Sequence, residues 1–154
     1  MPGNNDISIR RLGAQDRRLA RSTFALMVEV FGEPPAALSD QYLDVLLARP
    51  EFWTFAALQN NTVVGGLTAH TLMMTAFEGT EVFVYDIAVA ADHQRQGIGR
   101  RLIDALRREA REIGISTIFV LADDEDREAL EFYKALGGKP TRVTLFEFGL
   151  AATS

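Results

Sequence analysis

The chain has 154 residues, of which 47% are hydrophobic and 24% charged, and its formal net charge is −5. This length and balance are typical of one globular domain and exclude a disordered chain, a collagen-like fibre and a coiled coil. Cysteine is absent, which excludes disulfides, thiolate metal sites and a cysteine nucleophile. The two histidines, His70 and His93, lie far apart in the sequence, so no metal site is expected. The acidic charge also argues against a protein that binds nucleic acids or anionic membranes generally.

The sequence contains no repeat, linker or low-complexity tract, and we predict a single domain over residues 1–154. Its first residues lack the basic and apolar regions of a secretory signal. No apolar run approaches the ~20 residues that a membrane span needs. We therefore expect a cytoplasmic protein with no membrane partner.

The first half of the chain predicts a strand, two helices and a hairpin. Period-two alternation indicates a strand over residues 7–11. Apolar residues at helical spacing predict helices over residues 15–31 and 39–48; Ser39 is a suitable N-cap for the second. Strands over residues 52–58 and 63–73 flank a turn-forming cluster, Gln59-Asn-Asn-Thr62, which indicates a hairpin.

The second half predicts strands that alternate with helices. A strand over residues 81–89 precedes an amphipathic helix over residues 97–113, and Gly114 stands where a left-handed C-cap is wanted. A buried strand over residues 117–121, a helix over residues 126–136 and an alternating strand over residues 142–148 follow. The last strand is expected to close the sheet. The order β-α-α-β-β-β-α-β-α-β predicts a layered α/β or α+β protein in which helices cover a mixed sheet.

The most distinctive local feature is a glycine turn between a predicted strand and a predicted helix, Gln94-Arg-Gln-Gly-Ile-Gly-Arg-Arg101. Glycines allow a tight turn, and a helix N-terminus offers unpaired N–H groups and partial positive charge. Together these features suit a pyrophosphate. The spacing fits neither the dinucleotide fingerprint nor the P-loop. A plain strand-to-helix turn is the alternative interpretation.

Three segments in this order resemble the GNAT superfamily, the GCN5-related N-acetyltransferases. They are the glycine turn, the preceding Tyr85-Asp-Ile-Ala-Val89, and the later Ala129-Leu-Glu-Phe-Tyr-Lys-Ala-Leu-Gly137. The order of elements from residue 7 to residue 148 matches as well. The resemblance implies the acyl-CoA N-acyltransferase fold, with a mixed and mostly antiparallel sheet flanked by helices.

The resemblance implies acetyl-CoA as the acetyl donor. The donor would lie between the strand ending at residue 89 and the strand over residues 117–121. Its pantetheine arm would pair with the backbone of Ile87, Ala88 and Val89, as an added strand does. The pyrophosphate would be bound at the glycine turn, formed by Gln94, Arg95, Gln96, Gly97, Ile98, Gly99 and Arg100.

Two proton movements accompany acetyl transfer to an amine. Because no cysteine can carry the acetyl group, direct transfer in a ternary complex is favoured. Asp86 is an acidic residue in an otherwise apolar strand and is the leading candidate for the base or for the amine anchor. Tyr133 occupies the position that commonly supplies the acid in the family. An exposed strand position and a packed helix tyrosine are the structural alternatives.

Within the superfamily, the chain resembles the aminoglycoside 3-N-acetyltransferases of the type I group. The resemblance lies in Tyr85-Asp-Ile-Ala-Val89, Asp92-His-Gln-Arg-Gln-Gly-Ile98, the pattern of Asp123 and Asp126, Phe146-Glu-Phe148, and Phe31-Gly-Glu33 followed by Ser39-Asp-x-Tyr-Leu43. It implies a polycationic amine as acceptor, bound by Tyr85, Asp86, Asp123 and Asp126. Glu81 is a weaker candidate for the acceptor site. By analogy with such folds, a homodimer is also expected.

Other functions remain open at this stage. A relative could acetylate a polyamine, an amino acid or a protein N-terminus. A non-catalytic acyl-CoA-binding module is a further alternative, although it would need neither Asp86 nor Tyr133. A nucleic-acid-binding domain that uses the arginine-rich helix over residues 97–113 is weakened by the acidic net charge.

Overall fold

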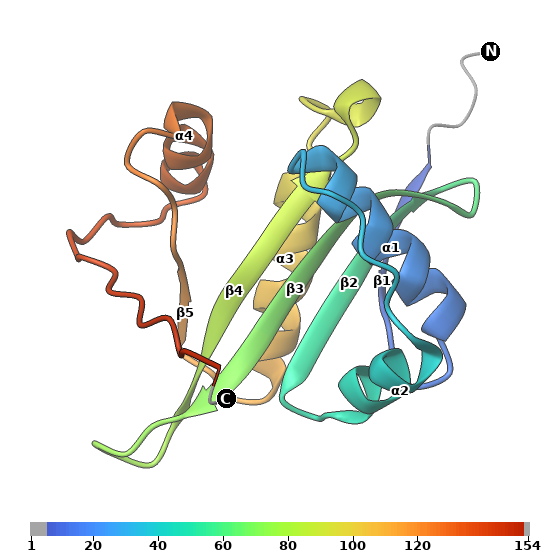
Figure 1. Ribbon diagram of the computed structural model, residues 1–154. Coiled ribbons are helices and arrows are strands. Elements are labelled where there is room, and N and C mark those ends of the chain that lie inside the picture. Colours follow the sequence, from blue (N-terminus) through green and yellow to red (C-terminus); the bar gives the residue numbers. More distant parts are fainter. Residues whose placement is uncertain (1–5, 153–154) are drawn as a thin grey trace. The chain divides into compact units, whose positions relative to one another are not determined.

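The computed structural model describes residues 6–152; residues 1–5 and 153–154, at the ends of the predicted domain, lie outside this range. The described chain forms two compact units, which meet in sequence between Leu121 and Ala122 (Figure 1). That the whole chain acts as one domain stays a prediction.

The first unit is built on one five-stranded sheet, in the order β1-β2-β3-β4-β5. The strands are β1 (Ile7–Arg11), β2 (Phe52–Gln59), β3 (Thr62–Met73), β4 (Thr80–Val89) and β5 (Thr117–Val120). The pairs from β1 to β4 are antiparallel, and β5 runs parallel to β4. The prediction of a mixed, mostly antiparallel sheet flanked by helices is confirmed.

Helices cover both faces of this sheet (Figure 1). They are α1 (Arg17–Val30), α2 (Asp40–Ala48) and α3 (Ile98–Glu112). A short 3₁₀ helix, η1 (Ala91–His93), follows β4 and was not predicted from the sequence. A Cβ atom on Gly66 would point at Thr23 and Met27 of α1, whereas one on Gly65 would point toward Ile98 of α3. Successive residues of β3 thus face opposite helical layers, as period-two alternation requires.

The predicted local signals are present where they were expected. The Ser39 hydroxyl accepts a hydrogen bond from the Tyr42 N–H at 3.1 Å and caps α2. Asn60 and Asn61 adopt φ values of 50° and 65°, the left-handed pair that a two-residue hairpin turn needs. Gly114 has a φ of 82° just after α3, as the predicted C-cap requires.

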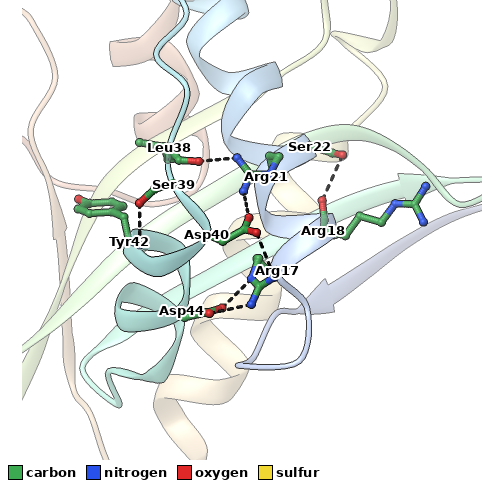
Figure 2. A network of polar contacts seen from close by, with 9 residues as sticks. All are labelled: Arg17, Arg18, Arg21, Ser22, Leu38, Ser39, Asp40, Tyr42 and Asp44. Carbon is green, nitrogen blue, oxygen red and sulfur yellow. Dashed lines mark hydrogen bonds and ion pairs between the residues drawn. The ribbon is translucent and has the colours of Figure 1, made fainter.

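An ion-pair network joins α1 to α2 (Figure 2). The Arg17 guanidinium donates two parallel hydrogen bonds to the Asp44 carboxylate, both at 2.7 Å, and lowers the pKa of that carboxyl. Arg21 donates to the Leu38 carbonyl and to the Asp40 carboxylate. Exposed ion pairs contribute little stability singly, but bidentate geometry and a shared network fix orientation. The network therefore fixes the start of α2 relative to α1.

The core of the first unit lies between the sheet and its helices. Its largest fully buried apolar side chains come from α2, β3, β4 and α3: Leu43, Leu67, Val82, Val84, Ile98, Leu102 and Leu106. The apolar stripe predicted along the helix over residues 97–113 is the buried face of α3. No helix in residues 6–152 is both long and apolar enough to span a membrane.

The second unit contains α4 (Arg127–Ala135), whose N-terminus is capped by the Asp126 carboxylate at 3.1 Å from the Ala129 N–H. Residues 138–152 form neither helix nor strand. The prediction of a strand over residues 142–148 is therefore wrong for this structure. Alternating side chains make a segment compatible with a sheet, but a strand exists only where its backbone pairs with another strand.

Candidate active site

A β-bulge in β4 determines which side chains face α1. Thr68 of β3 pairs with Asp86, whereas the next residue, Ala69, pairs with Val84, so Tyr85 is the extra residue. Thr68 lies two residues from Gly66 and shares its face, the face toward α1. Its partner Asp86 is on that same face.

Tyr85 also lies on the α1 face. Its ring contacts His70 at 5.7 Å and Phe83 at 5.8 Å between centroids, and these two residues are cross-strand partners. In a regular strand, consecutive side chains point to opposite faces, but at a bulge two consecutive side chains can lie on the same face. Tyr85 and Asp86 are therefore brought together on one face.

Tyr85 belongs to a row of rings that crosses the sheet. The contacts run from Phe24 through Phe52, His70, Tyr85 and Phe83 to Phe119 on β5, with centroids 5.0–6.2 Å apart. Tyr85 is 61% exposed, so one side of its ring is open beside Asp86. An aromatic face next to a carboxylate suits a cationic ligand with an apolar skeleton.

Asp86 is the titratable residue whose surroundings are most unusual. Burial raises the pKa of its carboxyl above the ordinary value, and the nearby negative charge of Glu33 raises it further. In the part of the chain that the structure describes, no hydrogen bond or ion pair stabilises its charged form. A half-buried carboxylate without a cation is costly, and its pKa is moved toward the range where a base can work near neutral pH.

Among residues 6–152, the edge of β4 that faces β5 has no strand partner beside Asp86. Pairing with β5 ends at Val84 and Val120, while β4 continues to Val89. The backbone of Ile87, Ala88 and Val89 therefore lacks a strand partner on the β5 side, and the Val89 carbonyl accepts a hydrogen bond from the Gln94 side chain. An extended ligand can add to such an edge as a strand does. The Ala88 side chain is buried, so it packs in the core without occupying that edge.

The glycine turn follows this edge. Gly97 has a φ of 80°, a conformation that favours glycine, and it immediately precedes α3. Among the described residues, the N–H groups of Gln96, Gly97, Ile98 and Gly99 have no hydrogen-bond acceptor. A Cβ atom on Gly97 would meet nothing within 4 Å, so the space in front of the turn is open. These features fit an anionic group such as a pyrophosphate.

Two glutamine side chains hold the turn in place. The Gln94 amide donates to the Val89 carbonyl at 3.1 Å, and the Gln96 amide donates to the Asp92 carbonyl at 3.4 Å. Arg95 has a φ of 63°, which completes the sharp change of direction. Gln94, Arg95, Gln96 and Gly97 thus form the turn, and Ile98, Gly99 and Arg100 are the first residues of α3.

The structure separates Glu81 from Asp86. Both residues lie on β4, but five residues of an extended strand span roughly 16 Å. Glu81 pairs with Leu72 and Thr117 at the opposite end of the strand. A direct role beside Asp86 is not supported by this placement.

The remaining predicted residues belong to the second unit. The Asp123 carboxylate accepts from the Glu125 N–H at 2.9 Å, and Asp126 caps α4, so both have local structural roles. Tyr133 lies on α4, where its ring contacts Phe132 at 5.1 Å between centroids. Their roles toward the acceptor and the leaving group stay predictions.

Sequence reasoning missed the neighbourhood of Asp86. Glu33 was noted only as part of a resemblance, and its approach to Asp86 joins residues on different elements. The aromatic row was also missed, because it joins rings from α1, β2, β3, β4 and β5. No local signal in the sequence marks either arrangement. Among residues 6–152, no cluster of histidines and carboxylates could hold a metal ion.

A free β4 edge that leads into a turn with unpaired N–H groups, with a carboxylate on the adjoining face, fits an acyl-CoA-dependent acyltransferase. Residues 17–137 match the model of the Acetyltransferase (GNAT) family, and the chain belongs to that family. Acetyl-CoA is the acetyl donor of these enzymes. The residues of the turn and of the β4 edge fit it, since they offer N–H groups to a pyrophosphate and an unpaired strand to an extended arm.

The structure resembles those of two aminoglycoside acetyltransferases from uncultured soil metagenomic samples. One, meta-AAC0020 in complex with sisomicin, is 33% identical with a TM-score of 0.91, over 96% of this chain and 99% of the other. The second, HMB0005, is 31% identical with a TM-score of 0.86, over 95% and 99%. A curated relative, the [ribosomal protein bS18]-alanine N-acetyltransferase of Escherichia coli K12, is 32% identical over 89 residues, 54% of this chain and 60% of that protein. The chain thus matches less than two thirds of this relative's length.

Proposed function

We propose that this protein is an aminoglycoside N-acetyltransferase that moves an acetyl group from acetyl-CoA to an amino group of the drug. The observation that carries the proposal is the 33% identity and TM-score of 0.91, over nearly the full length of both chains, with an aminoglycoside acetyltransferase in complex with sisomicin. The 3-N position rests on the resemblance of Tyr85-Asp-Ile-Ala-Val89 and its companion segments to the type I group.

Asp86 acts as the base. An amine with a pKa near 10 is mostly protonated at neutral pH, and releasing its proton costs roughly 4–5 kcal/mol. The half-buried Asp86 carboxylate, with its raised pKa, takes this proton directly or through a water. The freed nitrogen attacks the thioester carbonyl, the new C–N bond forms, and the C–S bond breaks.

Tyr133 acts as the acid. The departing CoA thiolate takes a proton from the Tyr133 hydroxyl, and the nitrogen gives up its second proton through water to the tyrosinate as the amide forms. The products are the acetylated amine and the free thiol, with the first proton held by Asp86. A tyrosine with a pKa near 10 can protonate a thiolate of slightly lower basicity once that thiolate is forming in a site shielded from water. Transfer is direct, because the chain has no cysteine to carry the acetyl group.

The donor occupies the edge and the turn. The backbone of Ile87, Ala88 and Val89 pairs with the pantetheine arm, and the turn from Gln94 to Arg100 binds the pyrophosphate. A polycationic acceptor lies on the α1 face, where the open ring of Tyr85 adjoins Asp86. From the resemblance, Asp123 and Asp126 are proposed to bind further ammonium groups of that acceptor.

A second candidate is an enzyme that acetylates a protein N-terminus. The 32% identity with the [ribosomal protein bS18]-alanine N-acetyltransferase favours it, although the match covers 89 residues. Another small amine, such as a polyamine, would suit the same carboxylate. A module that binds acyl-CoA without catalysis has no use for the unpaired Asp86.

The deciding experiment measures thiol release from acetyl-CoA with gentamicin, sisomicin, spermidine and a panel of peptides that begin with alanine. The chain contains no cysteine, so the protein adds no thiol background to a colorimetric thiol assay. Turnover with gentamicin or sisomicin is expected, and NMR of the product identifies the acetylated nitrogen. Turnover with peptides alone would replace the proposal by the second candidate.

The wider setting follows from the reaction. We place the enzyme in the cytoplasm, where acetyl-CoA is available, and propose that its expression raises aminoglycoside resistance in a susceptible host. We also propose a homodimer, by analogy with such folds. Light scattering after size-exclusion chromatography tests the dimer, and growth at graded gentamicin concentrations tests the resistance.

A further inference from the structure

The residues before the glycine turn lie at the same end of the sheet as the β2–β3 hairpin. Strands β2 and β4 are each antiparallel to β3, so they run in the same direction and end on the same side (Figure 1). Gln59 is the last residue of β2, and η1 begins two residues after the end of β4. The topology of the sheet therefore brings Gln59 and η1 to one end of it.

A side-chain hydrogen bond joins these two segments. The His93 Nε2 atom lies 2.8 Å from the Gln59 Oε1 atom, between residues 34 positions apart in sequence. A carbonyl oxygen only accepts, so Nε2 carries the ring proton and donates it. The His93 side chain is half-buried, and its Nδ1 atom is buried without a hydrogen-bond partner among the described residues. Within residues 6–152, the hydrogen bonding of the ring therefore depends on Gln59.

Gln59 is a firm partner because its backbone lies inside the sheet. It pairs with Ile7 of β1 on one side and with Thr62 of β3 on the other. A backbone that is paired on both sides opens less readily than an exposed loop. The hydrogen bond from His93 thus ties η1 to an ordered part of the sheet.

The position of the glycine turn follows from the position of η1 and of the end of β4. Residues 94–97 are exposed, so they bury little surface of their own. The Gln96 amide lies 3.4 Å from the Asp92 carbonyl oxygen, near the upper limit for a hydrogen bond. In η1, by contrast, the His93 N–H donates to the Ala90 carbonyl at 2.8 Å. The turn is therefore attached to η1 by a weak bond, and η1 itself is held by short ones.

Resting on the donor site proposed above, we propose that His93 is a positioning residue for CoA. Its bond to Gln59 holds the turn so that the N–H groups of residues 96–99 meet the pyrophosphate without rearrangement. A site that is ordered before its ligand arrives loses less entropy on binding, which raises the affinity. His93 acts through the backbone of the turn and not through the reacting atoms. It therefore affects the binding of the donor and leaves the chemical step nearly unchanged.

The test compares His93→Phe with His93→Gln. Phenylalanine keeps an aromatic ring and loses the hydrogen-bond donor, whereas the glutamine amide keeps a donor that can reach Gln59. The affinity for CoA is measured by calorimetry without any acceptor. His93→Phe is expected to weaken CoA binding about three- to tenfold, the range of one neutral hydrogen bond, and His93→Gln less than about twofold. A role in packing alone predicts the opposite order of the two variants.

Gln59→Met tests the same hydrogen bond from its other partner. Gln15→Met is the matched control, because it makes the same exchange at an exposed residue before α1. Gln59→Met should weaken CoA binding as His93→Phe does, the double variant should be no weaker than either single variant, and Gln15→Met should change nothing. With sisomicin as acceptor, the KM for acetyl-CoA should rise by the same factor while kcat stays within about twofold. General damage to the fold would not give this split between KM and kcat.

Two results would overturn the inference: equal CoA affinities of His93→Phe and the wild type, or equal losses in His93→Phe and His93→Gln. If His93→Phe does not fold, Gln59→Met decides the question. Failure of the proposed function gives different results. A wild-type protein that binds CoA and acetylates no acceptor refutes the proposed substrate, whereas the CoA affinities still decide the role of His93. An unchanged CoA affinity in Gly97→Ala would refute the donor site itself.

Discussion

Replacing Gly66 by alanine tests the packing of α1 on the sheet that carries Asp86. The new Cβ atom would lie 2.4 Å from Thr23 Cγ2 and 3.0 Å from Met27 Sδ. Carbon atoms pack at about 3.5–4.0 Å, so α1 and β3 must separate locally by about 1 Å. Thr23 is fully buried, and its hydroxyl donates to the Leu19 carbonyl at 2.8 Å, which limits its escape into another rotamer.

The expected cost follows from overpacking in a close-packed core. Such substitutions cost about 1–3 kcal/mol in the free energy of unfolding. For a chain of this size, each kcal/mol lowers Tm by roughly 2–4 °C. Gly66→Ala should therefore lower Tm by roughly 2–12 °C, measured by calorimetry or circular dichroism.

A double-mutant cycle isolates the contact. Thr23→Ser removes the methyl group that the new Cβ would strike and keeps the hydroxyl that bonds to Leu19. Gly66→Ala should cost less in the Thr23→Ser background than in the wild type, with a coupling of at least about 0.5 kcal/mol. An equal cost in both backgrounds, or no cost in either, would refute the placement of α1 against β3.

Three further predictions concern the site. Gly97→Ala and Gly114→Ala should each lower the free energy of unfolding by about 1–2 kcal/mol, because both positions have φ near 80° with open space around a Cβ. Only Gly97→Ala should raise the KM for acetyl-CoA. Equal KM values for the two variants would argue against the turn as the donor site. Asp86→Asn should lower kcat/KM by about 10²–10⁴-fold. It should also stabilise the fold near neutral pH by about 1 kcal/mol in urea unfolding, because it removes a half-buried unpaired charge. Because the pKa of Asp86 is raised, the folded wild type binds this proton more tightly than the unfolded chain does. The stability gained by Asp86→Asn should therefore disappear as the pH falls below the pKa of an aspartate in the unfolded chain, about 3.9. A stability gain that persists at such a pH has another cause. Tyr133→Phe should lower kcat by about 100-fold or more with little change in KM, and unchanged kinetics would remove Tyr133 as the acid.

Much of the fold was predictable because its signals are local. The Ser39 cap, the Asn60–Asn61 turn and the apolar stripe of α3 each depend on residues within one or two turns of chain. The glycine turn before α3 belongs to the same class, since its unpaired N–H groups follow from the start of a helix. The strand expected over residues 142–148 shows the limit of such signals. The side chains of this segment alternate between apolar and polar as in a strand, but its backbone forms a strand only if it pairs with another strand elsewhere in the chain.

The sequence by itself determined the order of the α-helices and strands from β1 to α4, the absence of a thiol route and the presence of one carboxylate within the apolar segment over residues 82–89. Only the tertiary structure decided what that carboxylate meets. The bulge at Tyr85 sets Asp86 and an exposed aromatic ring on one face, and burial there raises the pKa of the Asp86 carboxyl. The physical reason is the range of the interactions: caps and periodicity act over a few residues, whereas the register that pairs Thr68 with Asp86 depends on contacts between two different strands.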